Sequence, residues 1–86
     1  MNYEEIEKFI RNKAKANQPV RINFKTRKPV LGLFINESDY AELRRKNLWR
    51  IVSETRLDEY QSTRNTELAR IFNGAEFTKL EILTGQ

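Results

Sequence analysis

The sequence predicts a mainly β protein of the α+β class, with one N-terminal helix followed by a small, strongly bent barrel of five short strands. Three observations predict this class. Apolar residues recur at helical spacing near the N-terminus, alternate with polar residues over 20–24, and then form short segments separated by turn residues. We therefore expect a single domain over residues 1–86, with the helix at 3–16 and the barrel at 19–83.

The predicted helix has one apolar stripe. Its members are Tyr3, Ile6, Phe9, Ile10 and Ala14. Asn2 and Glu5 have the spacing of a capping box, in which each side chain accepts a hydrogen bond from the backbone N–H of the other residue. Pro19 limits the helix, because the residue before a proline is pushed out of the helical region. We expect the apolar stripe to pack on one end of the barrel.

Five strands are predicted at 20–25, 30–35, 47–52, 68–72 and 80–83. A closed barrel would hide most of the edges of such a sheet. Gly32 marks a bend or a close backbone approach within the second strand. Asp39 is expected to cap one helical turn through Glu42, and the polar segment 53–65 is expected to be a loop or a short helix.

Two spaced motifs carry a family resemblance. The first is Val20, Ile22 and Phe24, then Val30, Gly32 and Phe34, with Asp39 after them; the second is Phe72-Asn73-Gly74, then Phe77 and Leu80. The pattern resembles the Sm-like proteins (LSm proteins and bacterial Hfq), which have an N-terminal helix and a bent, SH3-like barrel of five strands. It covers roughly residues 3–35 and 68–83. The resemblance implies RNA binding.

The chain departs from the Sm-like pattern where that family contacts RNA. Asn73 stands where the family has a base-contacting arginine, and Tyr40 to Lys46 form an insertion after the motif aspartate. Sm-like rings pair the fourth strand of one copy with the fifth of the next, and here Arg70 and Glu81 interrupt these short strands. We therefore expect a monomer or a dimer. Trp49 and the segment 70–72 give a looser resemblance to the WYL domains of bacterial transcription regulators.

The positive charge is concentrated in residues 8–28, which we call the basic block. The formal net charge is +4, and the block contains basic residues but no acidic ones: Lys8, Arg11, Lys13, Lys15, Arg21, Lys25, Arg27 and Lys28. Such a block attracts phosphates or an acidic protein surface. The alternative is a solvated surface, part of which complements the C-terminal end of the helix dipole.

Six residues are candidates for nucleic-acid binding: Arg21, Lys25, Arg27, Lys28, Arg44 and Arg45. The first four come from the first strand and its turn, where basic side chains can follow a phosphate backbone. The alternative is an edge strand whose charges prevent aggregation. The other two lie near Tyr40 and Trp49, and cations mixed with aromatic rings can stack on bases. The alternative there is a core Trp49 beside a solvated loop.

The composition argues against several other functions. Histidine and cysteine are both absent, which excludes imidazole bases, thiolate nucleophiles and Cys/His metal sites within this chain. Asp58 and Glu59 supply too few oxygens for a magnesium site. We expect no catalytic residue, no metal, no cofactor and no membrane partner, and a cytoplasmic location. The expected function is a small non-catalytic module that binds RNA with low specificity through the basic block, or alternatively a protein–protein adaptor with an acidic partner.

Overall fold

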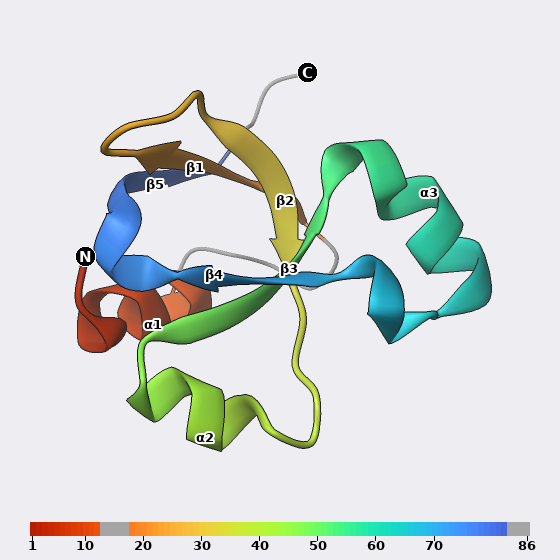
Figure 1. Cartoon of the computed structure of the whole chain (residues 1–86), viewed down its shortest axis with the longest axis horizontal. Coiled ribbons are helices and arrows are strands. Elements are labelled where there is room, and N and C mark those ends of the chain that lie inside the picture. Colours follow the sequence, from red (N-terminus) through yellow and green to blue (C-terminus); the bar gives the residue numbers. More distant parts are fainter. Residues whose placement is uncertain (13–17, 83–86) are drawn as a thin grey trace.

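The computed structural model describes residues 1–12 and 18–82 of the chain. In chain order its elements are α1 (Tyr3–Asn12), β1 (Val20–Phe24), β2 (Val30–Phe34), α2 (Tyr40–Arg45), β3 (Leu48–Ser53), α3 (Glu54–Thr63), η1 (Thr66–Leu68), β4 (Arg70–Asn73), η2 (Gly74–Glu76) and β5 (Phe77–Ile82). The two η elements are single turns of 3-10 helix. The predicted α+β class is confirmed, with an N-terminal helix and a five-stranded antiparallel sheet (Figure 1).

Helix α1 begins at the predicted capping box. The Oδ1 atom of Asn2 accepts a hydrogen bond from the backbone N–H of Glu5 at 2.8 Å, and Oε1 of Glu5 accepts one from the backbone N–H of Asn2 at 3.0 Å. These bonds satisfy donors that the first turn of a helix leaves without partners. The end of the predicted helix, from residue 13 to residue 16, lies outside the described residues.

The five strands are ordered β4-β3-β2-β1-β5, so β4 and β5 are the two edges of the sheet. All four neighbouring pairs are antiparallel. No pairing joins β4 to β5 among the described residues, and the predicted closed barrel is therefore wrong. There are two physical reasons, and both lie in β4. The strand has only four residues, and it places the charged side chain of Arg70 on the face of the sheet that a closed barrel would have to bury.

The main hydrophobic core lies on one face of the sheet, which we call the inner face, against α1. Its buried members are Ile6, Val20, Ile22, Trp49, Ile51, Phe77 and Leu80. Ile6 is fully buried, whereas Phe9 and Ile10 are partly buried against the same cluster. These three residues therefore pack against the core, as predicted, but on one face of an open sheet and not at one end of a barrel.

The opposite face of β2 and β3, the outer face, is covered by α3. A second cluster forms there from Leu33, Ile35, Val52 and Tyr60, with Leu57 and Leu68 packed against it. The segment 53–65 thus contains a ten-residue helix that buries Tyr60. Gly32 allows the two strands to approach closely, because a Cβ atom at this position would collide with the Ile51 side chain and lie 3.2 Å from the Val52 carbonyl oxygen.

Helix α2 differs from its prediction. It runs from Tyr40 to Arg45, longer than a single turn, and Asp39 precedes it without a side-chain capping bond. The Asp39 carboxylate is instead held by Arg50 on β3, with 2.6 Å between Oδ2 and Nη2. A residue expected to start a helix therefore fixes the β2–α2 connection to the sheet.

The last two strands also begin at different residues than predicted. Thr66–Leu68 forms a 3-10 turn whose N-terminus is capped by the Asn65 side chain, so β4 begins only at Arg70. Strand β5 begins at Phe77, three residues before its predicted start. Its predicted last residue, Leu83, lies outside the described residues.

Asn47 connects three segments that are distant in the sequence. Its backbone has a left-handed φ of 60°. Its Nδ2 donates to the Met1 carbonyl oxygen at 2.9 Å, its Oδ1 accepts from Trp49 Nε1 at 2.9 Å, and its carbonyl oxygen accepts from the Gly74 N–H at 2.8 Å. A Cβ atom on Gly74 would collide with Asn47 and Ile6. This junction holds α1, β3 and η2 together.

Candidate nucleic-acid interface

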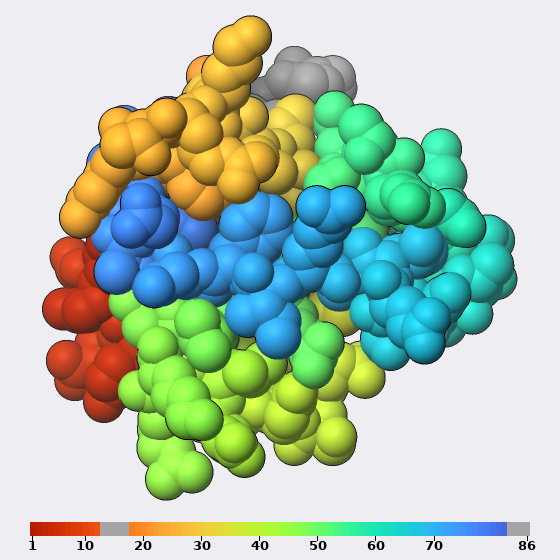
Figure 2. All heavy atoms as spheres, viewed as in Figure 1, coloured from red at the N-terminus to blue at the C-terminus, as the bar shows by residue number. Residues whose placement is uncertain are grey.

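Two adjoining pockets open on the inner face, between the β1–β2 turn and β4. The larger encloses about 540 Å³ and extends to α3 and η1. The smaller encloses about 340 Å³ and extends to η2. Arg27, Arg70 and Phe72 line both pockets, so we treat the two as one surface, the β4 groove. Figure 2 shows the turn (orange), β4 (blue) and the start of α3 (green) gathered on one face of the molecule.

Phe24 and Phe72 form the aromatic part of the β4 groove. Their ring centroids are 5.9 Å apart, and Phe24 also packs edge-on against the buried Phe77 ring at 5.3 Å. The guanidinium carbon of Arg27 lies 5.0 Å from the Phe24 centroid and 5.8 Å from the Phe72 centroid. Both distances are in the range of cation–π contacts. The groove therefore has half-buried rings with a cation held over them.

Arg70 projects into the groove from the edge strand β4. Arg70 lies opposite the buried Ile51 in the sheet register, so its side chain is on the inner face of the sheet. The Arg70 side chain is nevertheless exposed. The ion pairs of the described residues include neither Arg70 nor Arg27. Both charges are therefore available to an anionic ligand.

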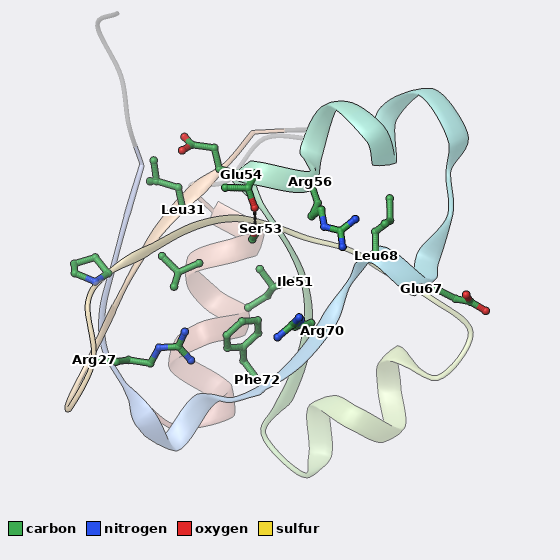
Figure 3. Close-up of a pocket in the computed structure, with 13 residues that line it drawn as sticks. Arg27, Leu31, Ile51, Ser53, Glu54, Arg56, Glu67, Leu68, Arg70 and Phe72 are labelled. Carbon is green, nitrogen blue, oxygen red and sulfur yellow. Dashed lines mark hydrogen bonds between the residues drawn. The ribbon is translucent and has the colours of Figure 1, made fainter.

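Three carboxylates also line the groove. Glu54 and Glu67 belong to the larger pocket, and Glu76 belongs to the smaller. In Figure 3 the carboxylates of Glu54 and Glu67 point away from the centre of the larger pocket, whereas Arg27 and Arg70 point into it. The side chains that face the centre of this pocket are thus more positive than the full set of residues around it.

Lys25 and Lys28 belong to the turn that carries Arg27. Both are exposed, and neither forms an ion pair with another described residue. The backbone N–H of Lys25 donates to the Glu76 carbonyl oxygen at 3.0 Å, which holds the turn against η2. Of the four candidates predicted in the first strand and its turn, Arg27 therefore lines the β4 groove. The two lysines lie on either side of Arg27 in the sequence.

Arg21, the fourth of these candidates, lies on β1 and belongs to an ionic network with Lys79 and Glu81 of the edge strand β5. Its Nε lies 3.9 Å from Oε1 of Glu81, and Lys79 Nζ lies 3.6 Å from Oε2. A hydrogen bond from Asn23 at 2.9 Å is the largest cause of a lowered pKa of Glu81, with smaller contributions from Lys79 and Arg21. The ionised carboxylate offsets these cations. Arg21 lines neither pocket, and its role in binding stays a prediction.

Arg44 and Arg45 lie on α2 and line neither pocket. Nη1 of Arg44 lies 3.0 Å from Oε1 of Glu7, so this side chain ties α2 to α1. Trp49 is only 2% exposed and belongs to the core, as the alternative interpretation of this segment holds. A base-stacking surface built from Trp49 and these arginines is therefore excluded. Arg45 is exposed and forms no ion pair with another described residue.

The described members of the basic block come from three separate parts of the fold. Lys8 and Arg11 lie on α1, Arg21 lies on β1, and the last three members lie in the turn. Lys13 and Lys15 lie outside the described residues. In Figure 1, α1 (red) and the β1–β2 turn (orange) lie on opposite sides of the blue turn that leads into β5. Among the described members of the block, only Arg27 of the turn lines the β4 groove.

Two residues on which the resemblance to the Sm-like proteins depends, Asn73 and Asp39, form hydrogen bonds within the fold. The Asn73 side chain lines the smaller pocket, but its Oδ1 accepts a hydrogen bond from the Ala75 N–H at 2.9 Å and shapes η2. Asp39 pairs with Arg50 through both carboxylate oxygens, at 3.3 and 2.6 Å. The hydrogen bonds from Arg50 are the main reason that the pKa of Asp39 lies below its ordinary value.

Phe24, Arg70 and Phe72 were not among the site residues that the sequence predicted. The signal was present in part, because Arg70 and Phe72 are two apart on one strand and so share a face. What the sequence does not reveal is that this face meets the turn after the first strand, more than forty positions away in the chain.

Over residues 1–12 and 18–82, no group of three or more acidic, His or Cys side chains is placed to hold a metal ion. None of the helices described is both long enough and apolar enough to cross a membrane. Comparison of the chain with family models, with curated proteins and with solved structures gave no match.

Proposed function

We propose that this protein is a small non-catalytic module that binds single-stranded nucleic acid, RNA in the first place, through the β4 groove. The observation that carries the proposal is that Arg27 and Arg70 line the same two pockets as Phe72, whose half-buried ring lies 5.8 Å from the Arg27 guanidinium carbon. Proteins that bind single strands combine cations for the phosphates with aromatic rings for the bases. The β4 groove offers both within one surface.

The arrangement favours low sequence specificity. Stacking on an aromatic ring accepts any base, because every base has a π face. Reading a particular base requires a fixed set of donors and acceptors at its edge. The side-chain oxygen of Asn73, which lines the smaller pocket, already accepts a hydrogen bond from the Ala75 N–H. The exposed cations Lys25 and Lys28 would contact further phosphates beside the groove.

The finer architecture that we propose is Sm-like. The fourth and fifth strands are the edges of the sheet, as that resemblance implies, and the short turn η2 with Gly74 joins them. The arginine by which the family contacts a base is replaced by Asn73. The proposed surface is therefore the β4 groove rather than the RNA site usual in that family.

The test compares two double variants with equal charge. Arg27→Glu/Arg70→Glu changes the groove, and Lys8→Glu/Arg45→Glu changes exposed cations that do not line it; each pair lowers the formal net charge from +4 to zero. The affinity for a mixed-sequence single-stranded RNA is measured by fluorescence anisotropy at low salt. The groove pair should weaken binding by more than about tenfold, because two phosphate contacts are replaced by repulsion.

The control pair should retain most of the wild-type affinity. An equal loss in both pairs would show that only the net charge matters and would contradict the proposed site. A wild-type protein that does not bind at low salt would contradict the proposed function. Circular dichroism and a thermal melt establish that all variants are folded.

A protein–protein adaptor is the second candidate, favoured by the free edge of β4. Ile71 on this edge is 48% exposed, the one large hydrophobic side chain of the described residues that is exposed. A free edge accepts an extended peptide as an additional strand, and acidic residues in that peptide would meet Arg27 and Arg70. Titration with acidic peptides in place of RNA, followed through the backbone amide shifts of β4, separates the two candidates.

A further inference from the structure

The larger pocket of the β4 groove continues past the start of β4 toward α3. Its far wall is formed by Ser53, Thr55 and Arg56 around the start of α3 and by Leu68 of η1. Its volume of about 540 Å³ lies in the usual range of small-molecule sites. A strand that follows β4 through the smaller pocket therefore reaches the residues around the start of α3 that line the larger pocket.

Three arginines line this pocket from three different elements. Arg27 comes from the turn, Arg56 from α3 and Arg70 from β4 (Figure 3). Nη1 of Arg56 lies 3.1 Å from Oε1 of Glu59, and both side chains are about half exposed. Exposed pairs of this kind are weak. A bound anion can therefore replace Glu59 as the ion-pair partner of Arg56.

Two hydroxyl groups stand in the same wall. Oγ of Ser53 and Oγ1 of Thr55 are 2.8 Å apart, so one of them donates to the other. The proton of the accepting hydroxyl remains free to donate to a ligand. The pocket thus combines three guanidinium groups with one hydroxyl donor.

We infer that the larger pocket binds the terminal phosphate of a single strand, and this inference rests on the proposed function. A phosphodiester within a strand carries one negative charge, whereas a phosphomonoester at its end carries about −1.5 to −2 at neutral pH and has three acceptor oxygens. Three guanidinium groups suit the higher charge and the larger number of acceptors. A nucleic-acid strand that reaches the α3 residues of the larger pocket would have its end in that pocket.

The test uses one short mixed-sequence RNA in four forms: with a 5′ phosphate, with a 3′ phosphate, with hydroxyls at both ends, and as a circle. One of the two phosphorylated forms should bind about tenfold more tightly than the hydroxyl-ended form. The circular form should bind like the hydroxyl-ended one. Which phosphorylated form is preferred gives the direction of the strand in the groove.

Three variants assign the preference to the pocket. Arg56→Ala should remove the preference and leave the affinity for hydroxyl-ended RNA within about twofold, because only an exposed pair is lost from the fold. Glu59→Gln, which releases Arg56, should keep or increase the preference. Arg45→Ala, which removes an exposed arginine outside the groove, should not change it.

Equal affinity for the phosphorylated and hydroxyl-ended forms would overturn the inference and leave the proposed function standing. A preference that survives in Arg56→Ala would also overturn it. A free nucleoside monophosphate that binds as tightly as the phosphorylated strand would assign the pocket to a free nucleotide instead. Failure of all four forms to bind would overturn the proposed function itself.

Discussion

The guanidinium carbon of Arg27 lies 5.0 Å from the centroid of the Phe24 ring. This contact holds an unpaired cation at the mouth of the β4 groove, where it also lies 5.8 Å from the Phe72 ring. An exposed cation–π contact contributes about 0.5–1 kcal/mol to stability. Its larger effect here is to position Arg27 before a ligand arrives, since a side chain that is already ordered loses less entropy on binding.

Arg27→Lys separates the charge of this residue from its planar shape. The variant keeps the positive charge but loses the flat guanidinium that stacks on rings and bonds phosphate with two donors. We expect RNA binding several-fold weaker than wild type, and a free energy of unfolding lower by less than about 1 kcal/mol. Anisotropy and urea denaturation measure the two effects. Unchanged affinity would show that the residue acts only as a point charge.

Ile6→Ala tests the attachment of α1 to the inner face. The side chain is fully buried, so its removal should lower the free energy of unfolding by about 2–5 kcal/mol. Phe9→Ala should cost less than the range of about 3–5 kcal/mol for a fully buried phenylalanine, because Phe9 is only partly buried. Urea denaturation of both variants measures the difference. A loss of more than about 3 kcal/mol in Phe9→Ala would contradict its partial burial.

Asp39 makes stability depend on pH. Its pKa is lower in the folded state because Arg50 bonds the carboxylate, so the folded state favours the ionised form. The resulting stabilisation is complete above the ordinary carboxyl pKa of about 3.9 and is lost as the pH falls through the lowered pKa. Asp39→Asn should therefore reduce the loss of stability on acidification. Denaturation midpoints of the two proteins, measured from neutral to acid pH, should converge; parallel curves would contradict this role.

The two free edges of the sheet bear on assembly. Strand β4 has four residues, and Glu81 of β5 is engaged with Arg21 and Lys79. Pairing β4 of one copy with β5 of another would bury little apolar surface, so we expect a monomer or a dimer. Light scattering at micromolar concentration measures the molar mass. A closed ring of several copies would contradict this expectation and would favour the ring assembly of the Sm-like proteins.

Local features of the fold were predictable from the sequence. The capping box at Asn2 and Glu5 depends on residues three apart, and the alternation over 20–24 assigns Ile22 to the core from neighbouring residues alone. The close approach at Gly32 was predictable for the same reason. Strand closure was not, because it depends on whether β4 and β5 meet, and no local pattern states how two edges lie in space.

The candidate site was predictable only in part. Arg27 belongs to a basic turn that is conspicuous in the sequence, but the contact of this turn with β4 does not follow from the strand pattern. Arg70 and Phe72 acquire their role from the register of β4 against β3, which sets them opposite Ile51 and Trp49. The part of the pocket wall that α3 supplies could not be predicted, because the sequence does not show that this polar segment packs on the outer face through Tyr60.

The salt dependence of RNA binding tests the central claim most directly. Within residues 1–12 and 18–82, four exposed cations lie in or beside the β4 groove and form no ion pair with another residue of these ranges: Lys25, Arg27, Lys28 and Arg70. With four phosphate contacts, the logarithm of the association constant should fall against the logarithm of salt concentration with a slope of about −2.8. The slope should shrink to about −1.4 in Arg27→Glu/Arg70→Glu and stay near −2.8 in Lys8→Glu/Arg45→Glu. Equal slopes in the two double variants would contradict the assignment of the site to the β4 groove.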